Sequence, residues 1–321
     1  MPTDHQSEIP APSQAPIVSM PVELVLDAHA ELAEGPLWDA ERQVLWWVDI
    51  TTGRVHRFDP ATGNDAVIEI GRPVGCVALR VDGGLVVAAP EGLLALNPET
   101  GGLEPITRFE PGPVPLRCND GKCDPHGRFW IDRLALDRAP GTSSLVRLGA
   151  PGPVSQGPRF ETVLRGLTIP NGLDWSADGK RMYFVDSPTR VVSMFDFDAM
   201  SGAIANGGSF ARVDASLGLP ASAVPDGLTV DEEDCVWVAV WGGGCVLRFA
   251  PDGSLFGRID IPVARVSSCA FGGADLTDLF ITTAWEDATP DELAAQPSAG
   301  GIFRARPGVR GRLAGRLRQG A

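Results

Sequence analysis

The sequence has few histidines, and its cysteines form no metal-binding or redox motif. Only four histidines occur among the 321 residues, in scattered positions: His5, His29, His56 and His126. A histidine-rich zinc site and a Ser-His-Asp triad therefore lack their base, and GxSxG and Walker-type loops are also missing. The six cysteines contain no CxxC pair, and we expect most of them to be small buried residues on strands. One pairing, Cys235 with Cys245, would flank a hairpin turn, but a reducing cytoplasm would keep both thiols free.

Positive charge and long apolar runs are also scarce. The chain carries 27 Lys and Arg against 41 Asp and Glu, which gives a formal net charge of -14. Nucleic acid and anionic membrane surfaces are therefore poor partners. No segment has the unbroken apolar length of a membrane span, and the stretch before Met20 lacks the apolar region of a signal peptide. We expect a cytoplasmic protein that has no nucleic-acid or membrane partner and is a monomer or a weak homo-oligomer.

Glycine and proline are abundant, and they separate short apolar segments. The 38 glycines and 28 prolines lie between runs of Val, Ile, Leu, Trp and Phe. This spacing is typical of many strands joined by turns. With 44% hydrophobic residues, the chain can bury a large core without a disulfide or metal to stabilise it.

One pattern recurs six times along the chain. It consists of a glycine-containing lead-in, a turn rich in Asp or Gly, and a hydrophobic strand. The lead-ins lie at residues 35–38, 75–79, 120–124, 171–175, 226–230 and 268–271. A period of roughly 40 to 55 residues built from short strands predicts propeller blades, because each unit is too small to bury its own apolar face. A β-sandwich would give a similar strand count but no reason for the lead-in to recur.

We therefore predict an all-β fold, a six-bladed β-propeller in a single domain over residues 21–307. The segment Val22–Leu26 is expected to pair beside residues 302–305 and close the ring. Residues 1–20 and 308–321 are interpreted as flexible tails, the second with solvated arginines.

A polar residue stands at the lead-in position of four repeats, next to or near a glycine. These residues are Glu34, Asn119, Asn171 and Asp226. Each one alone is an ordinary turn residue. Because the innermost strand of every blade reaches the mouth of a propeller, four of them at one repeat position favour a shared site. Carboxylate and amide oxygens suit calcium, magnesium or manganese.

Four motifs carry a family resemblance. They are Glu34-Gly35-Pro36-Leu37-Trp38, the stretch from Arg117 to Pro125 (RCNDGKCDP), the stretch from Pro170 to Trp175 (PNGLDW) and Pro225-Asp226-Gly227. In this order they resemble the gluconolactonase, regucalcin (senescence marker protein) and luciferin-regenerating enzyme family, from about Val22 to about Pro307. The last repeat is similar to bacterial sugar lactonases.

The resemblance implies one divalent cation and a set of site residues. Its metal ligands match Glu34, Asn171 and Asp226, and its substrate contacts match Arg117, Asn119 and Asp137. Calcium is the first expectation for the metal, with zinc, manganese, magnesium or iron as alternatives. The implied activity is metal-dependent hydrolysis of a sugar lactone such as gluconolactone, xylonolactone or arabinonolactone to the aldonic acid. Asp226 is then either the general base or a metal ligand only.

Two departures from the family pattern affect specificity. The stretch Ile131-Asp132-Arg133-Leu134 replaces a small Gly-Thr-Met-like segment, and Trp285 replaces an arginine. Both are expected near the substrate ring, and Trp241 and Trp285 are candidates for the wall of the pocket. A greasier pocket would favour a metal-dependent esterase or phosphotriesterase on the same propeller. A non-catalytic calcium-binding propeller is the other alternative, since fold alone does not give function.

Overall fold

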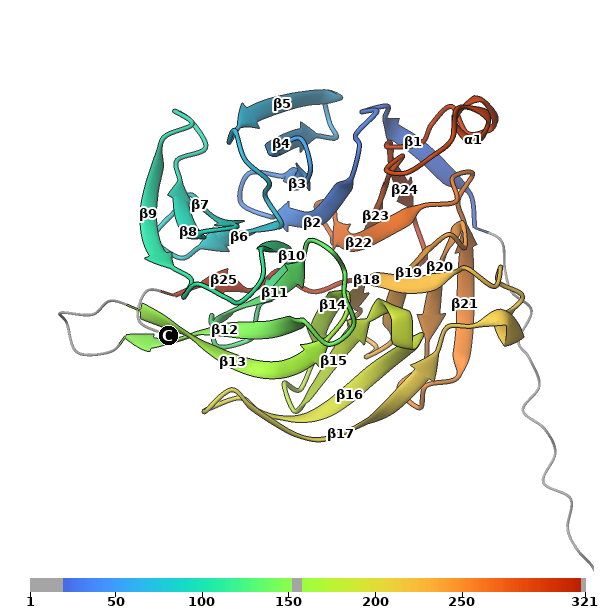
Figure 1. Ribbon diagram of the computed structural model, residues 1–321. Helices are drawn as coiled ribbons and strands as arrows, with labels where there is room; N and C mark the ends of the chain where they lie inside the picture. The colour runs from blue at the N-terminus through green and yellow to red at the C-terminus, as the bar shows by residue number, and fades with distance from the viewer. Residues whose placement is uncertain (1–19, 152–157, 319–321) are drawn as a thin grey trace, which may run out of the picture.

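The computed structural model describes residues 20–151 and 158–318, and it consists of six blades arranged radially around one axis, each built on four antiparallel strands (Figure 1). Blade 1 contains β2 (Ala33–Asp39), β3 (Val44–Asp49), β4 (Arg54–Asp59) and β5 (Asn64–Glu69), and blade 2 contains β6 (Cys76–Arg80), β7 (Leu85–Ala89), β8 (Gly92–Leu96) and β9 (Leu103–Arg108). Blade 3 contains β10 (Leu116–Cys123), β11 (Phe129–Ala135), β12 (Ser143–Pro151) and β13 (Pro158–Leu167), and blade 4 contains β14 (Pro170–Trp175), β15 (Arg181–Asp186), β16 (Val191–Asp198) and β17 (Ala203–Arg212). Blade 5 contains β18 (Val224–Val230), β19 (Val236–Trp241), β20 (Cys245–Phe249) and β21 (Leu255–Asp260), and blade 6 contains β22 (Val266–Gly272), β23 (Asp278–Thr283), β24 (Ile302–Ala305) and β1 (Val22–Leu26). The predicted six-bladed propeller is confirmed.

The two ends of the propeller sequence meet in blade 6. The strand β1 pairs antiparallel with β24, with Val22 opposite Ala305 and Leu26 opposite Ile302. The predicted closure of the ring is therefore confirmed. The first strand of the chain thus becomes the outer strand of the last blade, and this pairing closes the ring of blades.

Apolar residues on both faces of each blade pack against the neighbouring blades. In β19, Val236, Val238 and Val240 pack with residues of blade 4, whereas Trp237 and Ala239 pack with residues of blade 6. Because successive side chains of a strand point to opposite faces, a strand buried on both sides needs a continuous apolar run. This explains why the inner strands of the repeats have such runs.

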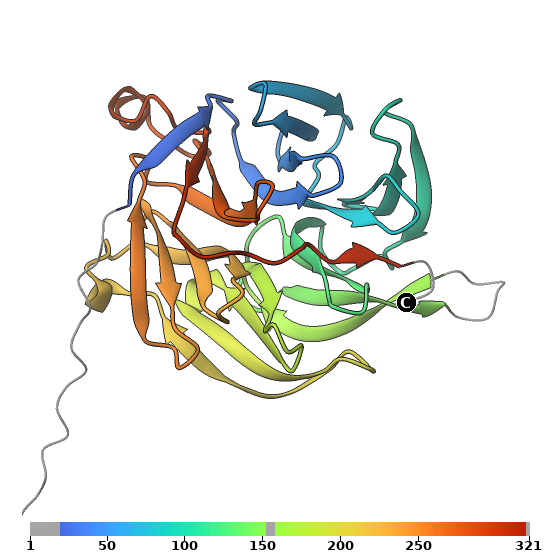
Figure 2. The same cartoon turned by 180° about the vertical axis from the view of Figure 1, so that it is seen from behind.

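The C-terminal segment is part of the propeller. Residues Arg316–Leu317 form β25, which pairs in parallel with β6, and the side chain of Leu317 is buried. Arg312 donates to the carbonyl oxygens of Val230 and Trp175. Figure 2 shows this red segment crossing the back of the molecule. The prediction of a flexible tail is wrong for residues 308–318, because Val309 and Leu317 anchor a segment whose composition is otherwise polar. The predicted N-terminal tail lies almost wholly outside the described residues.

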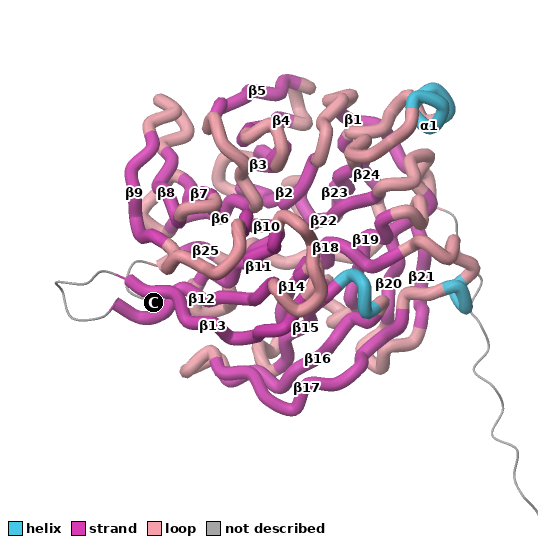
Figure 3. The backbone as a smooth tube through the Cα atoms, viewed as in Figure 1, coloured by secondary structure: helices cyan, strands magenta, loops and turns pink. Residues whose placement is uncertain are grey.

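Helices are a minor part of the described chain. They are α1 (Pro290–Ala295) and two 3-10 turns, η1 (Ser187–Thr189) and η2 (Ala215–Leu217). Figure 3 shows strands and loops elsewhere. Within residues 20–151 and 158–318, no helix has the length and apolar character needed to cross a membrane.

All six cysteines are buried free thiols. Cys245 lies opposite Val240 in the β19–β20 hairpin, whereas Cys235 precedes β19. The two thiols are therefore at different ends of the hairpin, and they cannot form the disulfide considered from the sequence.

Candidate functional site

The four lead-in residues lie on the innermost strands of four blades, at the same structural position. Glu34 belongs to β2, Asn119 to β10, Asn171 to β14 and Asp226 to β18. Each of these strands shifts register with its partner at this point, between Glu34 and Leu37, Cys118 and Gly121, Pro170 and Leu173, and Pro225 and Leu228. Such bulges re-aim side chains that a regular ladder would hold in a fixed direction.

Two of the glycines that follow these residues, Gly172 and Gly227, are required by the close approach of neighbouring inner strands. A Cβ atom on Gly172 would lie 2.5 Å from the backbone nitrogen of Leu228, and one on Gly227 would lie 2.1 Å from Ser268 Oγ. No larger residue fits without moving the next blade. The recurrent pair of a polar residue and glycine is thus a consequence of packing around the axis as well as of chemistry.

These residues line one cavity of about 90 Å³. Its polar lining comprises Glu34, Arg117, Asn119, Arg138, Asn171, Ser187, Asp226 and Glu286. Its apolar lining comprises Leu32, Leu134, Ile169, Val224 and Trp241. Trp241 therefore forms part of the wall, as expected, whereas Trp285 is not among the lining residues and instead donates its indole N–H to His29 O at 2.9 Å.

The oxygen donors in this cavity fit a divalent cation. Asn171 Oδ1 and Asp226 Oδ1 are buried and have no hydrogen-bond partner among the described residues. The amide orientation follows from Asn171 Nδ2, which donates to Ser187 Oγ at 3.3 Å and leaves the oxygen free for a ligand. Glu34 is also buried, and its Oε2 accepts from Gly35 N at 2.8 Å. A buried oxygen without a donor is costly, and a cation would satisfy all three side chains.

The electrostatics of the cavity also favour a cation. Burial raises the pKa of Glu34 well above its ordinary value, and the nearby carboxylates of Asp226 and Asp120 raise it further. Burial likewise raises the pKa of Asp226, with Asp120 as the next cause. The cationic side chains that line the cavity are Arg117 and Arg138, and Arg138 pairs with Glu286, so the carboxylates of Glu34 and Asp226 lack full compensation. A divalent cation would provide that compensation.

Arg117 and Asn119 form a hydrogen-bonded unit beside the oxygen donors. Arg117 Nη1 donates to Asn119 Oδ1 at 2.7 Å and to Cys118 O at 2.9 Å. Asn119 Nδ2 in turn donates to Pro170 O at 2.8 Å, directly before Asn171. Asn119 thus ties the guanidinium of blade 3 to the ligand-bearing strand of blade 4.

The structure does not bring Asp137 into this group. Its side chain is exposed and accepts from Ala139 N at 3.1 Å, so that it stabilises the turn after β11. Asp137 is not among the lining residues, whereas the next residue, Arg138, lines the cavity, and the substrate contact at Asp137 stays a prediction. A third acidic residue lines the cavity beside Glu34 and Asp226, namely Glu286 from the loop after β23. The sequence feature that could have pointed to Glu286 is its position directly after Trp285, a residue predicted to line the pocket.

The departure at residues 131–134 affects the cavity only through Leu134. Asp132 is fully buried and is not a lining residue, and neither of its carboxylate oxygens has a hydrogen-bond partner among the described residues. The guanidinium of Arg133 lies 3.6 Å from the centroid of the Phe109 ring. The expectation that Asp132 and Arg133 sit at the substrate ring is therefore not met, since successive strand residues face the two neighbouring blades.

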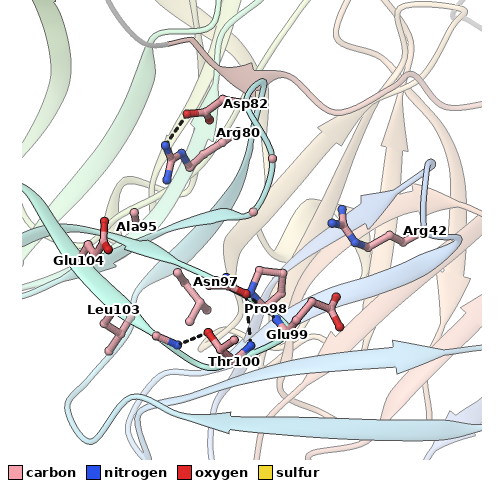
Figure 4. Close-up of a pocket in the computed structure, with 14 residues that line it drawn as sticks. Arg42, Arg80, Asp82, Ala95, Asn97, Pro98, Glu99, Thr100, Leu103 and Glu104 are labelled. Carbon is pink, nitrogen blue, oxygen red and sulfur yellow. Dashed lines mark hydrogen bonds and ion pairs between the residues drawn. The ribbon is translucent and has the colours of Figure 1, made fainter.

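Two other places in the molecule are less suited to this chemistry. A larger cavity of about 620 Å³ lies beside blades 1 and 2 (Figure 4), where Arg80 pairs with Asp82 at 2.6 Å and Asn97 accepts from backbone N–H groups of its own turn. The side chains of Asp231, Glu233 and Cys235 lie close enough to hold a metal ion. Arg248 already pairs with both carboxylates, at 2.6 and 2.7 Å, and a cation there would have to displace it.

Comparison with known proteins identifies the family. The SMP-30/Gluconolactonase/LRE-like region matches residues 32–285. The chain belongs to this family. It is 36% identical to pentonolactonase XacC of Haloferax volcanii, over 91% of this chain and 97% of that protein. It is 34% identical to the 6-deoxy-6-sulfogluconolactonase of Pseudomonas putida, over 87% of this chain and 92% of that protein. Among solved structures, a calcium-binding regucalcin of Agrobacterium tumefaciens superposes with a TM-score of 0.85 at 26% identity, covering 94% of this chain and 99% of that one.

Proposed function

We propose that this protein hydrolyses a sugar lactone to the open aldonic acid, with one divalent cation held by Glu34, Asn171 and Asp226. The observation that supports it most is the pair of buried, unpartnered oxygens, Asn171 Oδ1 and Asp226 Oδ1, beside the Arg117–Asn119 unit in one cavity. The family contains sugar lactonases, and two relatives at about a third identity are named for pentonolactone and sulfogluconolactone hydrolysis. An aldonolactone such as gluconolactone, xylonolactone or arabinonolactone is the proposed substrate.

The chemistry is the addition of water to the lactone carbonyl, followed by cleavage of the ring ester bond. When bound, a divalent cation supplies a Lewis acid for the carbonyl oxygen and offsets the negative charge that develops there. Calcium is the proposed cation, since a ligand set of carboxylates and an amide is made of oxygen alone.

The residues of the chain supply orientation and proton transfer in this proposal. Arg117, held by Asn119, faces the lactone and positions its carbonyl side. Asp226 accepts a proton from the attacking water, and that proton then passes to the ring oxygen as the carbon–oxygen bond breaks. The walls at Leu134, Ile169 and Trp241 exclude bulk water from one side of the ring.

The test is steady-state hydrolysis of the three aldonolactones, followed by acid release, with Arg117→Ala and Asn119→Ala as variants. We expect both variants to retain the metal and to lose turnover by about a hundredfold, because positioning is lost while the ligands remain. Metal content is measured in parallel. Equal turnover by the wild type and both variants would contradict the assigned role of the pair.

The apolar wall favours one rival, a metal-dependent esterase or phosphotriesterase. Five of the lining residues are Leu, Ile, Val or Trp, which is compatible with a substrate more hydrophobic than a sugar lactone. An aryl ester and a phosphotriester are therefore included in the same assay. Turnover of these substrates without turnover of any aldonolactone would replace the proposed function by the rival.

A further inference from the structure

An ion pair spans two blades at the edge of the cavity. Arg138 Nη2 lies 3.3 Å from Glu286 Oε2, and the two residues are 148 positions apart in sequence. Arg138 belongs to the turn after β11, and Glu286 belongs to the loop after β23. Both line the cavity, yet neither belongs to the proposed cation ligands or to the Arg117–Asn119 unit.

Glu286 is held firmly by its backbone. Its N–H donates to Glu31 O at 2.9 Å, and the N–H of the preceding Trp285 donates to the same oxygen at 3.1 Å. The Trp285 indole adds a bond to His29 O. The side chain of Glu286 is only 16% exposed. Its carboxylate is therefore presented to the cavity from a fixed loop.

Arg138 is the more solvent-exposed partner. Its backbone has a φ of 51° and its N–H donates to Ala135 O at 2.9 Å, which closes a tight turn. Its side chain is 47% exposed. A long side chain anchored at the backbone and exposed at its end can follow a ligand more readily than the Glu286 carboxylate can.

The charge of Glu286 reaches the groups that would surround a substrate. Burial lowers the pKa of Arg117, and the Glu286 carboxylate opposes that shift. Glu286 thus lies within electrostatic range of Arg117, which lines the same cavity.

We propose that Glu286 is a specificity-determining residue that accepts hydrogen bonds from the ring hydroxyls of the substrate, and that Arg138 is the positioning residue that holds its carboxylate at the mouth. This inference rests on the proposed function and names what the site selects, a lactone with hydroxyl groups. A carboxylate acceptor is a strong partner for a hydroxyl, and a site built to bind a hydroxyl group rejects an analogue that lacks it.

The experiment compares two lactones with the same six-membered ring, gluconolactone and the hydroxyl-free δ-valerolactone. The variants are Glu286→Ala, Glu286→Gln, Arg138→Met and Arg138→Lys. The matched control is Glu23→Ala, which removes the carboxylate of another ion pair between residues far apart in sequence. Glu23 pairs with Arg304 at 2.6 Å on the outer edge of blade 6, away from the cavity.

We expect Glu286→Ala to raise KM for gluconolactone by about tenfold to a hundredfold while kcat changes little, because hydrogen bonds to charged groups contribute on this scale. Kinetics on δ-valerolactone should stay within about twofold of the wild type, since no hydroxyl is lost. Arg138→Met should give a smaller increase in KM on gluconolactone, and Arg138→Lys should restore part of it. The metal content and the Glu23→Ala kinetics should be unchanged.

Three results would overturn the inference. If Glu286→Ala lowers the activity on both lactones equally, Glu286 serves the reaction or the fold and does not select the substrate. If the KM for gluconolactone is unchanged in Glu286→Ala, Glu286 does not bind the substrate hydroxyls. If the wild type hydrolyses neither lactone, the proposed function fails and the inference fails with it. If the wild type hydrolyses gluconolactone and only the variant results differ from expectation, the inference alone fails.

Discussion

The two ends of the inner strands differ in how their polar side chains are satisfied. Each of β10, β14 and β18 carries one polar residue at the cavity and a second one three positions later, on the opposite side of the propeller. At the cavity these are Asn119, Asn171 and Asp226, and at the other end they are Lys122, Asp174 and Thr229.

At the far end, the carboxylate of Asp174 is fully partnered. Its Oδ2 accepts from Lys122 Nζ at 3.0 Å, Thr229 Oγ1 at 3.2 Å and Val230 N at 3.1 Å. Its Oδ1 accepts from Trp175 N and lies 3.5 Å from a guanidinium nitrogen of Arg312, which arrives from the C-terminal segment. Buried polar groups are normally satisfied in this way.

At the cavity, by contrast, Asn171 Oδ1 and Asp226 Oδ1 have no partner among the described residues. The same strands therefore provide a structural network at one end and an open ligand set at the other. Both ends of the inner strands carry polar residues, so the cavity is distinguished from the far end by its buried oxygens without hydrogen-bond partners.

The largest expected effect is at the cavity end. Asp226→Ala removes an anionic ligand and the proposed base, so metal binding should be lost and lactone hydrolysis should fall by about a thousandfold or more. Calorimetric titration with calcium and manganese measures binding, and circular dichroism checks that the fold is retained. Full metal stoichiometry in this variant would remove Asp226 from the ligand set.

The matched change at the far end should act on stability instead. Asp174→Ala leaves the partly buried Lys122 amine and Arg312 guanidinium without their shared carboxylate, which should lower the free energy of unfolding by about 2 kcal/mol after allowance for their exposure. Urea denaturation measures this, and metal stoichiometry should stay at the wild-type value. Loss of the metal with Asp174→Ala would show that the two ends are not independent.

The smallest expected effect concerns Asp132, a buried carboxylate that lacks a hydrogen-bond partner among the described residues and lies outside the cavity. Burial raises the pKa of Asp132 well above its ordinary value. Because its folded-state pKa exceeds the unfolded one, its contribution to stability is present at low pH and is lost as pH rises through the folded pKa. Asp132→Asn should therefore be more stable than the wild type by about 1 kcal/mol at about pH 8, with little difference near pH 4.

Denaturation of both proteins across this pH range is the measurement for Asp132. Metal binding should be the same in both, since Asp132 lies outside the cavity lining. A stability difference that does not depend on pH would mean that Asp132 has the same pKa in the folded and unfolded states, which would contradict the raised pKa.

The repeat, the fold and the polar residue on four of the six inner strands follow from the sequence alone. The reason is local, because continuous apolar strands, turn residues and the glycines at close strand contacts all leave a pattern within each repeat of the chain. The residues Glu34, Asn119, Asn171 and Asp226 could be grouped for that reason, because the symmetry of a propeller carries one repeat position to one place in space.

Only the tertiary structure decided what does not follow that symmetry. Glu286 and Arg138 come from loops that differ between blades, and their meeting across 148 residues leaves no periodic signal. The direction of a turn, which leaves Asp137 out of the cavity lining and presents Arg138, depends on a backbone hydrogen bond to Ala135. The C-terminal segment looks like a solvated tail by composition, and it is held by two buried apolar side chains and by the single strand β6 that accepts it. Such contacts depend on long-range packing, which no local pattern records.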